Sequence, residues 1–295
     1  MRILLAGGSG FLGRRLQAAL RADGHDVGVL TRTPRAEGDV AWAPDGTTGP
    51  WARALEGAGA LVNLAGEGIA DKRWTPARKQ AIRDSRLAPT ESLVAALRTL
   101  AAPPAVLVSS SAVGYYGACG DEIVTEHTPP GSDPLAQLCV DWERAAEAAS
   151  ALTRVCVIRT GLVLHPEGGA LETMLVPFRL GVGGRLGSGR QYMPWIHLDD
   201  WIRMTAWLIA TPGAAGAFNA TAPAPVTNAT FTRTLARVLR RPAIFPVPGV
   251  ALRLVLGEFA TFVLTGQRAV PEHAERLGFT FRFTELDPAL RDLLG

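Results

Sequence analysis

The stretch from residue 2 to residue 13 constrains the fold more than any other part of the sequence. It reads Arg-Ile-Leu-Leu-Ala-Gly-Gly-Ser-Gly-Phe-Leu-Gly. The apolar run 3–6 is typical of a strand that is buried on both faces of a parallel sheet. Glycines follow at once, and from residue 14 the chain predicts a helix. A strand, a glycine turn and a helix in this order are the context in which a dinucleotide-binding turn works.

The glycines of this turn fit two spacings. Gly8, Gly10 and Gly13 make G-x-G-x-x-G, whereas Gly7 with Gly10 and Gly13 makes G-x-x-G-x-x-G. In both, Gly10 lets the backbone approach a pyrophosphate, and Gly13 lets the helix pack tightly on the strand. Free N–H groups at the helix start would then bind the phosphates. A tight turn of purely structural purpose is the alternative. We expect the phosphates to contact Gly7, Gly10, Phe11, Leu12 and Gly13.

The residues after the second predicted strand, 26–30, indicate which dinucleotide is bound. The fingerprint expects an acidic residue about 20 positions on, where it binds a ribose hydroxyl. Here Thr31 and Arg32 stand in that region, with Arg35 nearby. A carboxylate would repel a 2′-phosphate, whereas a guanidinium would pair with it. We therefore expect NADP(H), with a solvated loop arginine as the alternative.

Alternating strands and helices predict the fold of the first half. Such alternation produces a doubly wound parallel sheet, so we expect an α/β Rossmann-type fold. We divide the chain into an NADP-binding domain, 1–164, and a smaller C-terminal substrate lobe, 165–295, of which about 195–222 returns to the sheet. Further strands are expected at 60–64, 105–108 and 155–159, and helices at 14–22, 51–57, 73–100 (broken near Pro89) and 135–152.

The second half has weaker signals. The glycine-dense run 181–189 contains Arg185 and is bordered by Arg179 and Arg190, and we interpret the run as a mobile substrate flap. The three arginines would favour an anionic substrate if they point inward, and surface arginines are the default. Residues 252–264 are apolar but interrupted by a glycine and a glutamate, which favours a core or groove helix. Other elements are predicted as a helix 201–210 capped by Asp199 and Asp200, a strand 217–220, a helix 230–239, an alternating strand 279–283 and a last helix 287–294.

Composition excludes several classes of function. The net charge of +3 comes from scattered arginines, so we expect no nucleic-acid partner. Three cysteines without C-x-x-C spacing favour reduced thiols and a cytoplasmic protein. No apolar stretch is long enough to span a bilayer, and the first strand follows Met1 directly, so we expect neither a membrane partner nor a signal peptide. The five histidines lack metal-binding spacing.

Together these motifs resemble the short-chain dehydrogenase/reductase superfamily. More narrowly, the chain is similar to the atypical, epimerase-like branch described as NAD-dependent epimerase/dehydratase, which has a C-terminal domain of undefined role. The resemblance covers nearly the whole chain and implies further cofactor contacts at Leu64, Ala65, Gly66, Arg86 and Val163. An ion pair of Arg86 with Asp84 or Glu91 is the alternative for that arginine. The matching segments are 7–13, 63–67, 73–75, 85–87, 109–117, 159–164 and 195–200.

The catalytic pattern departs from the superfamily. Its members typically use a serine or threonine and a tyrosine followed four positions later by a lysine, which lowers the pKa of the tyrosine. Here the only lysines are Lys72 and Lys79, and neither has that spacing. The expected window contains Leu135 and Cys139 instead. Ser111 matches the serine of the family, and Tyr115 or Tyr116 could replace the missing acid; we take these three as the catalytic candidates.

Two other side chains have the chemistry for catalysis. Cys139 could be a nucleophile, but no neighbour in the sequence would lower its pKa, so a buried cysteine is favoured. A histidine ordinarily has the right chemistry for a proton carrier near neutral pH, yet the resemblance implies a packing position for His197.

We therefore expect an NADP(H)-binding oxidoreductase or epimerase that acts on an unidentified small molecule, as a monomer or a homodimer. A non-catalytic NADP(H)-binding redox sensor is the first alternative. An interaction protein that uses residues 252–264 is the second.

Overall fold

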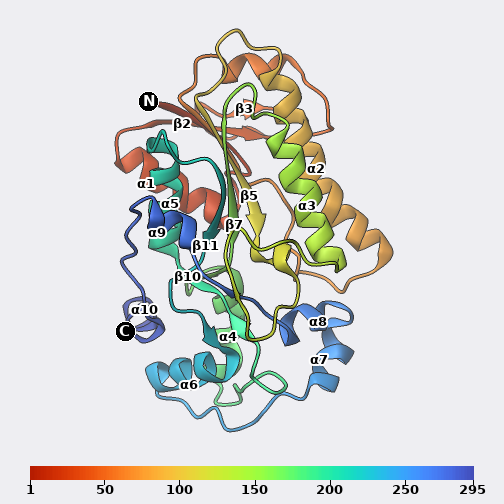
Figure 1. Cartoon of the computed structure of the whole chain (residues 1–295), viewed down its shortest axis with the longest axis vertical. Helices are drawn as coiled ribbons and strands as arrows, with labels where there is room; N and C mark the ends of the chain where they lie inside the picture. Colours follow the sequence, from red (N-terminus) through yellow and green to blue (C-terminus); the bar gives the residue numbers. More distant parts are fainter.

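The computed structural model describes residues 1–295 and has a parallel sheet at its centre (Figure 1). Every neighbouring pair in this seven-stranded sheet is parallel, and the order is β11-β7-β5-β4-β1-β2-β3. The order reverses between β1 and β4, where ligands of such sheets bind. The expected Rossmann-type fold is thus confirmed. The strands are β1 (Arg2–Ala6), β2 (Asp26–Thr31), β3 (Val40–Ala41), β4 (Ala60–Asn63), β5 (Val106–Ala112), β7 (Arg154–Thr160) and β11 (Gly216–Ala220).

Helices cover both faces of this sheet, which explains its apolar strands. In Figure 1, α1 and α5 lie on one side of the sheet, and α2 and α3 lie on the other. Ile3 and Leu5 of β1 belong to the first core, and Leu4 and Ala6 belong to the second. All four side chains are fully buried, so each face needs its own helical layer. These helices are α1 (Phe11–Ala22), α2 (Pro76–Leu97), α3 (Pro134–Glu147) and α5 (Leu198–Ala210).

The C-terminal lobe has a core of its own around Trp195, Phe231 and Leu290. The predicted strand 217–220 is confirmed as β11, which returns to the edge of the main sheet beside β7. The remaining elements are η1 (Pro50–Leu55), η2 (Val113–Tyr116), β6 (Ile123–Val124), β8 (Leu162–Leu164), α4 (Gly169–Arg179), β9 (Tyr192–Met193), β10 (Trp195–His197), β12 (Val226–Thr227), α6 (Asn228–Leu239), α7 (Gly249–Leu256), α8 (Phe259–Leu264), β13 (Arg268–Ala269), α9 (Glu272–Arg276) and α10 (Leu286–Leu294).

Helix α2 corrects one prediction, because it continues through Pro89. A proline removes one backbone hydrogen bond and crowds the carbonyl four residues earlier. Here the helix is anchored on both sides of the proline, since Ile82 and Leu93 are buried. Packing therefore outweighs the local break.

Helix α5 and the segment after α9 correct two more predictions. The Nδ1 atom of His197 accepts the N–H of Asp199 and caps α5, so the predicted aspartate cap is wrong. Asp200 instead accepts the N–H groups of Arg282 and Phe283, both at 2.8 Å. Because a carboxylate takes these donors, the predicted strand 279–283 does not form, although its alternate phenylalanines are buried.

The apolar segment 252–264 divides at Gly257 into two short helices with different surroundings. Phe259 and Phe262 of α8 pack on Trp74, with ring centroids 5.7 and 5.1 Å away. Helix α7 has no buried residue, so it is not the predicted core or groove helix. No helix of the chain has both the length and the apolar character needed to cross a bilayer.

Candidate active site

The glycine turn after β1 brings two strands and a helix into very close contact. A side chain on Gly7, whose φ is +78°, would lie 2.5 Å from the carbonyl carbon of Leu64 at the end of β4. One on Gly13 would lie 2.5 Å from the carbonyl oxygen of Gly7. Glycine is therefore required at both positions for packing. Gly10 differs, since a Cβ there would meet only one atom, at 3.4 Å.

The start of α1 can bind an anion. Gly10 is its N-cap and supplies no side-chain acceptor, so the N–H groups of Phe11, Leu12 and Gly13 have no partner within the protein. The helix dipole adds partial positive charge at the same point. The structure thus unites the predicted phosphate-binding residues around one set of free donors.

The end of β2 carries positive charge without an acid to neutralise it. Thr31 is the last strand residue, and Arg32 behind it is exposed and forms no ion pair. Asp39, the nearest following aspartate, is used within the loop, where it accepts the N–H groups of Arg35 and Ala36 at 2.8 and 3.0 Å. This geometry fits a 2′-phosphate better than a ribose hydroxyl.

The turn after β4 is fixed by buried polar contacts. The side chain of Asn63 accepts the N–H of Ala65 at 3.2 Å and donates to Thr90 of α2 at 2.9 Å. Leu64 and Ala65 therefore lie beside the glycine turn, and Gly66 follows them with its backbone close to Arg86.

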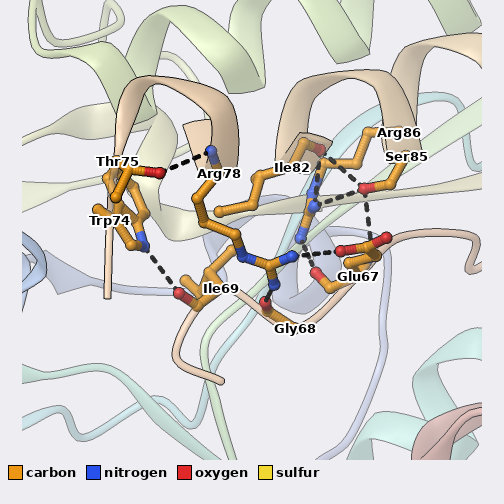
Figure 2. Close-up of polar contacts among 9 residues, drawn as sticks. All are labelled: Glu67, Gly68, Ile69, Trp74, Thr75, Arg78, Ile82, Ser85 and Arg86. Carbon is orange, nitrogen blue, oxygen red and sulfur yellow. Dashed lines mark hydrogen bonds and ion pairs between the residues drawn. The ribbon is translucent and has the colours of Figure 1, made fainter. Parts of the chain in front are cut away.

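Two arginines of α2 then hold the next part of this loop (Figure 2). Arg86 donates to the carbonyls of Glu67 at 2.9 Å and Ile82 at 3.0 Å. Arg78 pairs with the carboxylate of Glu67 and donates to the Gly68 carbonyl. The predicted alternative, an ion pair of Arg86 with Asp84 or Glu91, is wrong, because its guanidinium contacts loop and helix oxygens instead. Burial lowers the pKa of this guanidinium.

Ser111 lies in β5 and joins a buried charge pair that the sequence analysis missed. Its hydroxyl donates to Glu143 of α3 at 2.6 Å. Glu143 in turn receives two hydrogen bonds from Arg159 of β7, at 2.9 and 2.8 Å, and both side chains are about 5% exposed. A signal existed, because Arg159 interrupts an apolar strand and Glu143 follows Cys139 by one helical turn. Each buried charge demands a partner.

The two candidate tyrosines have different surroundings. The hydroxyl of Tyr116 donates to Asn219 at 2.7 Å and accepts from Arg159 at 3.0 Å, and burial raises its pKa to about 12. The ring of Tyr115 lies 3.5 Å from the Arg159 guanidinium carbon and is only half-buried, with its pKa also raised by burial. Tyr115 is therefore the more accessible of the two.

The positions of the usual tyrosine and lysine serve packing. Leu135 lies against Gly114 of η2, where any Cβ would meet the leucine side chain at 2.9 Å. Cys139 is buried, and burial raises the pKa of its thiol to about 12, as expected for a structural cysteine. His197 is also buried and caps α5.

Val163 and the predicted flap 181–189 lie in or next to the C-terminal lobe. Val163 of β8 is buried and pairs with Ile196 of β10. The flap 181–189 is attached to neighbouring segments, because Val247 exchanges backbone hydrogen bonds with Arg185 and Gly187. A groove of about 410 Å³ between the starts of α2 and α3 contains none of the predicted site residues.

Comparison with known proteins agrees with this geometry. The NAD dependent epimerase/dehydratase family model matches residues 3–220, and a domain of unknown function matches residues 247–293. An epimerase family protein of Mycobacterium bovis is 47% identical over 98% of this chain and 96% of its own length. The mouse epimerase family protein SDR39U1 is 37% identical over the full length of both chains.

Solved structures give the same result. The crystal structure of human epimerase family protein SDR39U1 with NADPH has a TM-score of 0.93 and 35% identity, over 100% of this chain and 99% of that one. The UDP-glucose 4-epimerase of Thermus thermophilus, solved with NAD, shares the fold at a TM-score of 0.78 and 18% identity, covering 100% and 97%. Sequence and structure together establish that the chain belongs to the NAD dependent epimerase/dehydratase family.

Proposed function

We propose that this protein binds NADP(H) between the ends of β1 and β4 and uses it as an oxidoreductase or epimerase on a small molecule. The observation that carries the proposal is the uncapped start of α1 behind a turn in which Gly7 and Gly13 leave no room for side chains. Such a turn presents several N–H donors to one anion. The overall similarity of this chain to the human SDR39U1 structure, which was solved with NADPH, supports it.

The preference for NADP(H) rests on Arg32 and Thr31. An exposed guanidinium without an acidic partner can form two hydrogen bonds with a 2′-phosphate. Leu64, Ala65 and Gly66 would line the cofactor from β4, and Val163 would approach it from β8. In this proposal Arg86 does not contact the cofactor, because its donors already bind the carbonyls of Glu67 and Ile82. It acts indirectly, by positioning the backbone of Glu67.

Ser111 could carry a proton from the substrate to Glu143. NADP(H) supplies or accepts the hydride when bound. The Ser111 hydroxyl donates to Glu143, which forms an ion pair with Arg159. The oxygen of Ser111 is therefore left to accept a proton from a substrate hydroxyl. A proton released there can pass to Glu143 through the serine. Tyr115, at the accessible side of Arg159, would orient the substrate.

The redox-sensor alternative is favoured by one observation. Tyr116 is fully engaged by Asn219 and Arg159, and Leu135 and Cys139 occupy the usual tyrosine and lysine positions. These are the features expected of a protein that retained the fold and lost proton transfer.

The proposal also includes a cytoplasmic location and a homodimer. The three free cysteines fit a reducing compartment.

The first test is a thermal-shift comparison of NADPH, NADP, NADH and NAD with the wild type and Arg32→Ala. A ligand at a hundred times its Kd stabilises the folded state by about 2.7 kcal/mol. We expect a clear shift with NADPH that is lost in Arg32→Ala, with a weak shift for NADH in both. Arg35→Ala is the matched control. No shift with any nucleotide would remove the proposal.

Turnover separates the enzyme from the sensor. NADPH oxidation would be followed against a panel of small carbonyl compounds for wild type, Ser111→Ala and Tyr115→Phe. An enzyme should lose at least about 100-fold in kcat with Ser111→Ala, the lower end of the range for a lost proton-transfer group, with NADPH binding retained. Activity that is unchanged in both variants would contradict the catalytic roles of Ser111 and Tyr115 and favour the redox-sensor alternative.

A further inference from the structure

Two segments of the C-terminal lobe, 176–187 and 240–256, lie side by side and form what we call the tip. The N–H of Val247 donates to the carbonyl of Arg185 at 2.8 Å, and the N–H of Gly187 donates back to Val247 at 2.9 Å. In Figure 1 the connection from α6 to α7 runs along the lower end of the molecule. The tip is therefore one continuous surface built from segments distant in sequence.

The tip collects exposed apolar side chains. Eight of the chain's twelve exposed large hydrophobic residues lie in these two short segments. Ile244, Leu254 and Val255 are each more than 70% exposed, and Phe245 is 60% exposed. Helix α7 has an almost wholly apolar sequence and no buried residue. A concentration of this kind marks an interaction surface.

The tip also has a one-sided charge. It contains five exposed arginines and no aspartate or glutamate, and none of the five forms an ion pair. The next acid along the chain, Glu258, already pairs with Lys79 at 2.8 Å. These unpaired arginines are Arg179, Arg185, Arg240, Arg241 and Arg253.

We propose that the tip binds the surface of an anionic lipid bilayer, with α7 lying in the membrane plane. Apolar side chains would enter the boundary of the acyl chains while the guanidinium groups contact lipid phosphates. Helix α7 is far too short to cross the bilayer, so the contact is peripheral. The proposal departs from the sequence-based expectation of no membrane partner, because that expectation did not include an exposed α7.

Other occupants fit the tip less well. A second copy of the chain would bring two sets of unpaired arginines together, which opposes association. A folded acidic protein would need pockets shaped to the projecting Ile244, Phe245 and Leu254. Acyl chains accept projecting side chains without shape complementarity, so the bilayer satisfies both the apolar and the charged parts of the tip.

The test is co-sedimentation with vesicles of phosphatidylglycerol and phosphatidylcholine, against vesicles of phosphatidylcholine alone. We expect binding to the anionic vesicles only, weakened by added salt. Arg240→Gln/Arg241→Gln should lower partitioning by about 25-fold, taking about fivefold for each arginine near an anionic surface. Leu254→Glu/Val255→Glu should abolish it. These positions are exposed, so the melting temperature should not change.

Matched controls are available on other surfaces. Ile123→Glu replaces a residue that is 56% exposed outside the tip, and Arg98→Gln/Arg276→Gln removes two exposed arginines there. Both should bind anionic vesicles like the wild type. Absence of binding at low salt, or equal binding by the tip variants, would overturn the proposal. A dimer in light scattering that Leu254→Glu/Val255→Glu dissociates, without vesicle binding, would overturn it in favour of a second copy.

Discussion

The glycine turn after β1 and the polar network between β5 and β7 lie at the same edge of the sheet, yet they treat polar groups in opposite ways. The turn leaves the first N–H groups of α1 without a partner in the protein. In the network, Ser111, Glu143 and Arg159 satisfy one another while almost completely buried. The turn is completed by a ligand, whereas the buried charges of the network are already paired within the protein.

This difference predicts different consequences of mutation. Removing a group from the turn should reduce nucleotide binding, because the fold does not depend on donors that have no internal partner. Removing a group from the network should reduce stability, because the groups left behind are buried and lose their partner. The following substitutions test this division.

Glu143→Ala should have the largest effect. It leaves the Arg159 guanidinium buried opposite a cavity, and breaking a buried ion pair in this way costs about 3–5 kcal/mol. The measurement is the free energy of unfolding from urea denaturation. Replacing both partners, as Glu143→Leu/Arg159→Met, should recover most of the loss, because no uncompensated charge remains. Equal destabilisation by the single and the double variant would show that packing, not charge, holds this region.

Gly13→Ala should have the next largest effect, because its Cβ would approach the Gly7 carbonyl oxygen to 2.5 Å. Relieving such a contact requires a backbone shift and costs about 1–3 kcal/mol. Gly10→Ala is the matched variant, since its Cβ meets only one atom at 3.4 Å. It should leave the melting temperature near that of the wild type and still weaken NADPH binding. Equal melting temperatures for both alanine variants would contradict the packing role of Gly13.

The same contrast explains how much could be predicted from the sequence. The turn is local: its strand, its glycines and the first residues of α1 lie within 12 consecutive residues, 2–13, so spacing alone predicts it. The network joins residues that are 16 and 32 positions apart, which only the packed sheet brings together. The resemblance places the usual tyrosine and lysine at Leu135 and Cys139, whereas the fold uses Glu143, one turn further along the same helix.

Errors elsewhere have a related cause. The alternation of Phe279, Phe281 and Phe283 predicts a strand, and the three side chains are indeed buried. No strand forms, because the N–H of Phe283 donates to the carboxylate of Asp200 instead of to a neighbouring strand. The apolar sequence of α7 predicted burial that the fold does not provide. In both cases a pattern reports which side chains are apolar, and the tertiary structure decides what they contact.

His197 gives the smallest effect and tests whether a buried polar group outside the network behaves in the same way. It is 2% exposed, its ring is stacked on Phe283 at 4.0 Å, and burial lowers its pKa below the ordinary 6.5 despite the nearby carboxylates of Asp199, Asp292 and Asp200. The unfolded state therefore binds the proton more readily than the folded state. Stability should be unaffected above pH 6.5 and should fall as the pH drops below that value.

The measurement for His197 is the free energy of unfolding as a function of pH for the wild type and His197→Asn. Asparagine can still cap α5 but does not titrate. The variant should lose less stability between neutral and mildly acidic pH than the wild type does, and the two curves should run parallel above pH 6.5. Parallel curves over the whole range would mean that the imidazole is protonated as readily in the folded protein as in the unfolded chain. Burial and stacking of the His197 ring would then not disfavour its protonated form. In that case a buried polar group outside the network would be no more sensitive to its surroundings than the exposed donors of the turn.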